Sequence, residues 1–157
     1  MSLGLINGLQ KYYQGSEIDL LVNDDTYSLA SLFPNIHHVY KFSYEKKKNN
    51  QWAQEKSLIS SIFRKYDLSI NLTASDRSVI YGIIASKFSI SAIEKNKKKS
   101  WWKSILLSNY YYFDNSKHIL LNNLKSLDIL KINHEKISPI IEPSKKTMNR
   151  VKSDLEK

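Results

Sequence analysis

The amino-acid sequence predicts an α/β fold, a Rossmann-like parallel sheet flanked by helices. Short apolar runs alternate with longer segments of helical periodicity, which is the pattern of βαβ units. Hydrophobic residues make up 41% of the 157 residues and aromatic residues 11%, enough to build a sizeable core. Only four glycines and three prolines are present, which further favours a folded chain over a disordered one.

Helix-breaking and helix-capping residues set the expected boundaries. Gly15 ends the first helix, Asp24 and Asp25 can cap the second, and Pro34 follows its end. In chain order we expect a helix over 3–13, a strand over 18–22, a helix over 24–32, a strand over 39–42, a helix over 51–65, a strand over 67–72, a helix over 76–86, a strand over 89–93 and a helix over 116–131.

The periodicity also predicts which side chains face inward. In the helix over 51–65 we expect Trp52, Ile59, Ile62 and Phe63 to be buried. The helix over 116–131 has a leucine stripe formed by Leu120, Leu124, Leu127 and Leu130. The strand over 89–93 is expected to be short and partly exposed, and residues 105–113 fit either a helix or a strand.

The chain divides into one domain and a short appendage. Residues 3–138 hold the alternating elements. Pro139 and Pro143 predict a linker, and Ser144 can cap a polar helix after it. Because that helix has few apolar positions, we expect residues 139–157 to be a linker and the start of a second domain that is absent.

The charge balance favours an acidic partner. Lys+Arg is 24 and Asp+Glu is 15, so the formal net charge is +9. Such a surplus favours nucleic acid, anionic lipid or a phosphorylated glycan. Only three of the 24 cations are arginines, at 64, 77 and 150, and a lysine-rich surface that is simply solvated explains the charge equally well.

Several classes of protein are excluded by composition. The chain has no cysteine, so it has neither a disulfide framework nor a thiolate metal site. It has no apolar run long enough to span a bilayer and no signal-peptide pattern at its amino terminus. The histidines lack metal-ligand spacing, so we assign no metal. We therefore expect a cytoplasmic protein.

The most informative segment is residues 66–78, a short strand that leads into a polar turn and a helix start. In α/β sheets, ligand sites form at the carboxyl ends of strands. Asn71, Thr73, Ser75 and Arg77 lie in this turn and would offer hydroxyl, amide and guanidinium groups to sugar hydroxyls, carboxylates or phosphates. The alternative is that Asn71 and Ser75 only cap the turn and the helix.

Two lysine clusters are further candidates for binding an anionic ligand. Lysine supplies charge without fixed geometry, which suits a target rich in phosphate. Solvated loops are the alternative for each lysine. The cluster members that we predict to bind the ligand are Lys46, Lys47, Lys48, Lys97, Lys98, Lys99 and Lys103. Beside the second cluster, Trp101 and Trp102 could stack on sugar rings or lie at a membrane surface, and we expect one of them to be in the core.

Four segments, taken in order, resemble the ADP-heptose:lipopolysaccharide heptosyltransferases (glycosyltransferase family 9), most of all the third heptosyltransferase of the lipopolysaccharide core. The segment over 64–78, RKYDLSINLTASDRS, is similar to the family's YDLVINLT…S segment. The other three are KYYQGSEIDLLV over 11–22, LFPNIHHVYKF over 32–42, and the tryptophan-containing segment over 98–129.

The resemblance implies the amino-terminal, acceptor-side half of a GT-B glycosyltransferase. Such an enzyme moves heptose from ADP-heptose to a core oligosaccharide or lipid A precursor at the cytoplasmic face of the inner membrane. The family's first strand and the loop that carries its proposed catalytic aspartate have no counterpart here. We therefore assign no catalytic residue and no cofactor, and expect this chain to be inactive alone, with ADP-heptose bound only when the other domain is present.

Two alternatives remain open. The chain could be a non-enzymatic basic module that binds an anionic glycan or nucleic acid, although no nucleic-acid motif appears. It could also be a remnant whose sheet lacks a strand, and exposed strand edges lead us to expect self-association.

Overall fold

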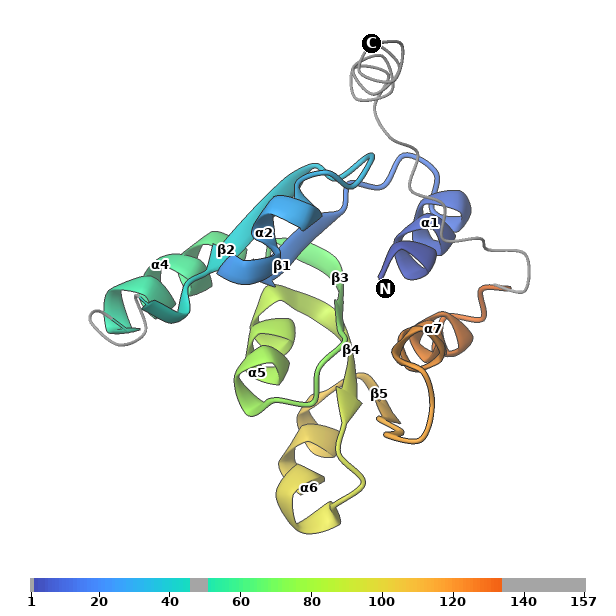
Figure 1. The fold of residues 1–157 in the computed structure, drawn as a ribbon. Coiled ribbons are helices and arrows are strands. Elements are labelled where there is room, and N and C mark those ends of the chain that lie inside the picture. The colour runs from blue at the N-terminus through green and yellow to red at the C-terminus, as the bar shows by residue number, and fades with distance from the viewer. Residues whose placement is uncertain (1, 46–50, 134–157) are drawn as a thin grey trace, which may run out of the picture.

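The computed structural model describes residues 2–45 and 51–133 and places helices around parallel sheets (Figure 1). This arrangement confirms the predicted α/β, Rossmann-like fold class. The described helices and strands are, in order, α1 Leu3–Tyr12, β1 Asp19–Asn23, α2 Asp24–Ala30, β2 His38–Phe42, α4 Gln51–Ile62, β3 Tyr66–Asn71, α5 Asp76–Ala85, β4 Ser86–Ile93, α6 Lys97–Leu106, β5 Asn109–Tyr112 and α7 Ile119–Ile129.

The strands form two sheets. β1 pairs with β2, while β4 lies between β3 and β5, and every pairing is parallel. From β1 the chain proceeds outward to β2, and from β3 it proceeds outward to β4 and β5. This is the strand order of a doubly wound sheet whose direction of winding reverses between β1 and β3. The break between the two sheets therefore lies at the reversal point.

β4 is the centre of the larger sheet. Ile90 and Ala92 pack with Ile129 of α7 on one face, whereas Ile93 packs with Val79 of α5 on the other. The expectation of a partly exposed strand over 89–93 was wrong, because all five of these residues are at most 3% exposed. The serines that gave the segment its polar appearance are buried and hydrogen-bonded: Ser91 Oγ accepts from Asn71 Nδ2 at 2.8 Å.

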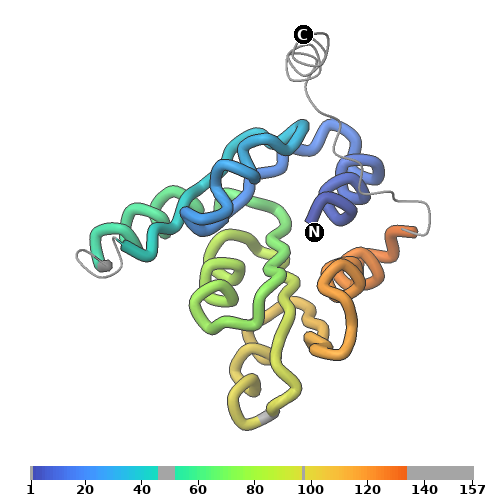
Figure 2. Tube along the Cα trace, in the orientation of Figure 1, coloured from blue at the N-terminus to red at the C-terminus, as the bar shows by residue number. Residues whose placement is uncertain are grey.

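Helices cover both faces of the larger sheet. α1 and α7 lie side by side on one face (Figures 1 and 2), where Leu5, Leu127 and Ile132 form a cluster with Ile70 of β3. On the other side, Phe42 of β2 joins a cluster with α4 and α5 that is formed by Leu58, Ile62, Tyr81 and Ala85.

Two of the four residues expected to face inward on the helix over 51–65 are exposed. Ile62 is buried and Ile59 packs against the same cluster, as predicted. Trp52, however, is 87% exposed and Phe63 is 63% exposed. Trp52 lies in the first turn of α4, which projects past the sheet (Figure 1), and Phe63 follows the end of the helix. Helical spacing predicts which side chains share one face of a helix, but those side chains are buried only where another element packs against the same turn.

The ambiguous segment over 105–113 contains both kinds of structure. It begins with the last turn of α6, and β5 follows after two residues. α7 starts at Ile119 rather than 116, since His118 caps it by accepting a hydrogen bond from Leu120 N. The proposed linker and polar helix over 139–157 lie outside the described residues.

Candidate functional site

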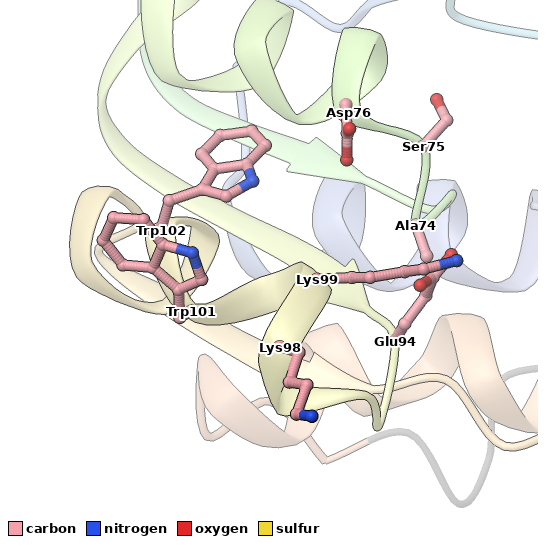
Figure 3. Close-up of a pocket in the computed structure, with 8 residues that line it drawn as sticks. All are labelled: Ala74, Ser75, Asp76, Glu94, Lys98, Lys99, Trp101 and Trp102. Atoms are coloured by element: carbon pink, nitrogen blue, oxygen red, sulfur yellow. The ribbon is translucent and has the colours of Figure 1, made fainter.

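A pocket of about 550 Å³ opens where β3 and β4 end, beside the first turns of α5 and α6 (Figure 3). Carboxyl ends of parallel strands are the usual place for ligand sites in α/β sheets. Residues from the β3–α5 turn, the end of β4 and helix α6 line the pocket: Ala74, Ser75, Asp76, Glu94, Lys98, Lys99, Trp101 and Trp102.

The two tryptophans differ in their surroundings. Trp102 is half-buried and packs against the cluster of Val79, Ile93 and Leu107, so one of the pair contributes to the core, as predicted. Trp101 is 62% exposed. An exposed indole at the edge of a polar pocket offers a flat apolar face on which a sugar ring can stack.

Charges of both signs surround the pocket. The Lys98 and Lys99 side chains and the carboxylates of Asp76 and Glu94 all contribute to its lining (Figure 3). This mixture provides donors for anionic groups and acceptors for hydroxyl groups.

Lys103 is buried and does not line the pocket. The residue is 1% exposed, and its Nζ donates to Ala74 O at 2.6 Å and pairs with Asp76 Oδ1 at 2.6 Å. Its ammonium also lies 5.6 Å from the centre of the Trp102 ring. Lys103 was predicted to contact the ligand, but its charge is already paired inside the protein and joins α6 to the turn after β3.

The turn after β3 is organised by its own hydrogen bonds. Asn71 Nδ2 donates to Thr73 O at 2.6 Å, and Asn71 Oδ1 accepts from Thr73 Oγ1 at 3.2 Å. Ser75 is the N-cap of α5, and its Oγ accepts from Ser78 N at 3.4 Å. The Thr73 Oγ1 and Ser78 Oγ atoms are 2.7 Å apart. Asn71 and Ser75 therefore have the capping roles that were the alternative interpretation, while Ser75 also lines the pocket.

Arg77 contacts α4 and β2 and not the pocket. Its Nε is 3.2 Å from Glu55 Oε1 on α4, and its guanidinium lies 4.7 Å from the centre of the Phe42 ring. It does not contribute to the pocket lining. Of the remaining predicted ligand-binding residues, Lys46, Lys47, Lys48 and the side chain of Lys97 lie outside the described part of the structure.

Asp76 and Glu94 line the pocket but were not predicted as site residues. Asp76 stands in the first turn of α5, and Glu94 directly follows β4. The rule that ligand sites form at strand ends could have indicated both, because each follows a predicted strand closely.

Over 2–45 and 51–133, no group of three or more His, Asp or Glu side chains is placed to hold a metal ion. No helix in the same ranges is long and apolar enough to cross a membrane.

Comparison with known proteins identifies related folds. Neither protein-family models nor curated proteins match the chain. Among solved structures, E. coli heptosyltransferase WaaC with ADP-2-deoxy-2-fluoro heptose matches with a TM-score of 0.70 at 12% identity, over 88% of this chain and 46% of that chain. The same enzyme with ADP matches with a TM-score of 0.69 at 12% identity, over 86% and 44%. This chain thus spans less than half the length of these structures, and it has the fold of that part of a heptosyltransferase, as the sequence resemblance predicted.

Proposed function

We propose that this chain is a fragment or truncated form of a lipopolysaccharide core heptosyltransferase and that it binds the acceptor sugar. The main support is the fold, which matches heptosyltransferase WaaC over 88% of this chain. In this proposal the chain forms the acceptor-side half of a GT-B enzyme. Transfer of heptose from ADP-heptose would require the nucleotide-sugar half, so the described chain should not catalyse transfer by itself.

The composition of the pocket supports an anionic carbohydrate as its ligand. Trp101 provides a stacking surface, and Lys98 and Lys99 provide ammonium groups for phosphate or carboxylate. Asp76 and Glu94 can accept hydrogen bonds from sugar hydroxyls. The proposed acceptor is the lipopolysaccharide core or a lipid A precursor, reached at the cytoplasmic face of the inner membrane, where exposed tryptophan and lysine side chains also favour peripheral contact.

The experiment is a titration of the purified chain followed by amide chemical shifts. One arm uses a heptose-containing core oligosaccharide and the other uses ADP-heptose. We expect the oligosaccharide to shift amides of residues 74–76 and 98–102 and ADP-heptose to shift none. Silence with both ligands in a folded sample would overturn the proposal, and a response to ADP-heptose alone would overturn the assignment to the acceptor side.

Variants with matched controls test which residues bind the oligosaccharide. Trp101→Ala should weaken oligosaccharide binding about tenfold, the loss expected for one stacked ring of roughly 1–1.5 kcal/mol. Trp52→Ala removes a tryptophan from α4 that is even more exposed, at 87% against 62%, and should leave binding unchanged. The double variant Lys98→Gln, Lys99→Gln should weaken binding, whereas Lys11→Gln, Lys56→Gln has the same net charge and alters exposed lysines elsewhere. Equal losses in both lysine pairs would indicate non-specific charge attraction.

A further titration with nucleic acid, at several salt concentrations, distinguishes a nucleic-acid-binding module. Such a module would bind single- or double-stranded nucleic acid with an affinity that falls steeply with salt. It would show little dependence on Trp101 or on the structure of the glycan. That result would replace the acceptor-binding proposal.

A further inference from the structure

The pocket at the ends of β3 and β4 is lined by as many carboxylates as ammonium groups. Asp76 and Glu94 supply the carboxylates, and Lys98 and Lys99 supply the ammonium groups (Figure 3). Their formal charges cancel, so these side chains alone give the pocket no preference for an anionic ligand over a neutral one. The sign of the potential in the pocket therefore depends on charged groups that lie close to it without lining it.

Lys103 is a charged group of this kind. Its Nζ lies 2.6 Å from Asp76 Oδ1 and donates to Ala74 O at 2.6 Å, and both partners line the pocket. Lys103 itself is 1% exposed, whereas the Asp76 side chain is 71% exposed. Water and salt therefore have access to the carboxylate but not to the ammonium, whose charge is screened only weakly. Lys103 thus places one buried positive charge next to two residues of the pocket lining.

Pairing with Lys103 changes what Asp76 contributes to the pocket. At a separation of 2.6 Å, the two opposite charges largely cancel at the distance of a bound ligand. Glu94 then remains as the carboxylate that opposes Lys98 and Lys99, and the pocket has an excess of positive charge. Because Lys103 contacts Oδ1, the other carboxylate oxygen of Asp76 can still accept a hydrogen bond from a sugar hydroxyl.

We propose that Lys103 makes the pocket selective for anionic over neutral saccharides without touching the ligand. It acts through Asp76, whose charge it neutralises, and is a specificity-determining residue rather than a catalytic one. This inference rests on the proposed function, in which the pocket binds a saccharide. The ligand class that it favours is a sugar with a phosphate or carboxylate group close enough to interact with Lys98 and Lys99.

A purely structural role for Lys103 leads to a different expectation. Lys103 joins α6 to the turn after β3, so its loss could displace residues that line the pocket. Such a displacement would weaken the binding of charged and neutral ligands alike. Selectivity, taken as the Kd of a neutral ligand divided by the Kd of its phosphorylated form, separates the electrostatic role from the structural one.

The first experiment measures this selectivity with one core oligosaccharide, used with its phosphate groups and after their enzymatic removal. In the wild-type chain we expect the phosphorylated form to bind more tightly. Lys103→Met should lower the selectivity about threefold, the effect of one unit charge at short range in a water-like dielectric. Asp76→Asn should raise the selectivity by a similar factor, because the charge of Lys103 is then no longer neutralised. The double variant Asp76→Asn, Lys103→Met should return to the wild-type selectivity.

Lys56→Gln is the control for net charge. It removes one positive charge from an exposed position on α4, outside the pocket lining, and should leave the selectivity unchanged. The inference is overturned by an unchanged selectivity in Lys103→Met, or by a double variant that is no closer to the wild type than Lys103→Met. A folded wild-type chain that binds neither form of the oligosaccharide would overturn the proposed function instead.

The second experiment needs no saccharide, so it tests the charge at the pocket independently of the proposed function. In a Trp52→Phe background, Trp101 is the most exposed remaining tryptophan, at 62%. Its fluorescence is quenched with iodide, an anion, and with neutral acrylamide at constant ionic strength, and Trp101→Phe in the same background measures the share that comes from Trp102. We expect Lys103→Met to lower the iodide quenching constant by about a third or more and to leave the acrylamide constant unchanged. The double variant with Asp76→Asn should restore iodide quenching, and equal changes with both quenchers, or none, would overturn the inference.

Discussion

The Tyr66 hydroxyl donates a 2.6 Å hydrogen bond to Asp19 Oδ2 and so connects the two sheets at their break. Asp19 also accepts from His37 Nδ1 at 2.9 Å and from Lys65 Nζ at 3.1 Å, and its side chain is only 6% exposed. This carboxylate therefore gathers groups from β3, from the residue before it and from the turn before β2.

Asp19 should stabilise the fold by an amount that decreases as the pH falls. Burial by itself would raise the pKa of Asp19, but hydrogen bonds from Tyr66, His37 and Lys65 outweigh it and hold the pKa below its ordinary value. A lowered pKa in the folded state means that the stabilisation is present above about pH 4 and is lost as the pH falls through the folded pKa. Asp19→Asn should cost about 2 kcal/mol at neutral pH and remove this part of the acid dependence.

Urea unfolding between about pH 6 and pH 2.5 measures that effect. Asp67→Asn is the control, because Asp67 is exposed on the same strand as Tyr66. The interpretation fails if the wild-type chain and Asp19→Asn lose stability in parallel as the pH falls.

Lys103 and Asp76 form one ion pair, but removing Asp76 should destabilise the fold more than removing Lys103. Asp76→Asn leaves the buried Lys103 ammonium without its counter-charge and should cost about 1–3 kcal/mol. Lys103→Met removes the buried charge and keeps a similar shape, so it should cost less than about 1 kcal/mol. The Asp76 carboxylate is 71% exposed, so water can solvate it once Lys103 is replaced.

Chemical denaturation of these variants and of the double variant tests this asymmetry. Asp25→Asn controls for the favourable effect of any carboxylate in a first helical turn, since Asp25 holds that position in α2 and is exposed. A larger loss in Lys103→Met than in Asp76→Asn would contradict the expectation.

The Tyr111 hydroxyl is buried and, in the described structure, has no hydrogen-bond partner. Burial raises the pKa of Tyr111 to about 12. Tyr111→Phe removes an unsatisfied polar group without changing the shape of the ring, so it should be neutral or stabilise the fold by about 1 kcal/mol. Tyr81→Phe is the counterpart: the Tyr81 hydroxyl donates to Glu55, and its loss should destabilise by about 1 kcal/mol. Thermal unfolding compares the two, and an equal loss of Tm in both would show that the Tyr111 hydroxyl has a favourable contact.

The open edges should cause self-association at micromolar concentration. Among the residues that the structure describes, β1 and β3 each have one unpaired edge at the break, and β2 and β5 are the outer edges of their sheets. Sedimentation velocity should show a mean mass that rises with concentration. A strictly monomeric chain that unfolds cooperatively across the micromolar range would refute this prediction.

Local pattern was sufficient for much of the fold. The strands near residues 18–22 and 67–72 were predicted, and capping was the alternative interpretation of Ser75, because apolar alternation, helix breakers and capping side chains act over a few neighbouring residues. Of the candidate site, Ser75, Lys98 and Lys99 were predicted and line the pocket, and Trp101 beside them was recognised as a possible stacking surface.

Tertiary contacts decided the rest. Lysine normally belongs to the surface, so no pattern indicated that Lys103 is buried; α6 packs against the turn after β3 and brings Ala74 O and Asp76 to its ammonium. Serine-rich β4 became the central strand because it pairs with β3 on one edge and β5 on the other, while Trp52 in the first turn of α4 stayed 87% exposed.

The sequence by itself thus determined the class of fold and the order of most of its elements, α6 and β5 excepted, since periodicity and capping are properties of adjacent residues. Only the tertiary structure decided which strands became edges, which polar groups were buried and which side chains met in the pocket. Those outcomes depend on free energies of contact between residues far apart in the chain, such as Asp19 with Tyr66 and Ala74 with Lys103.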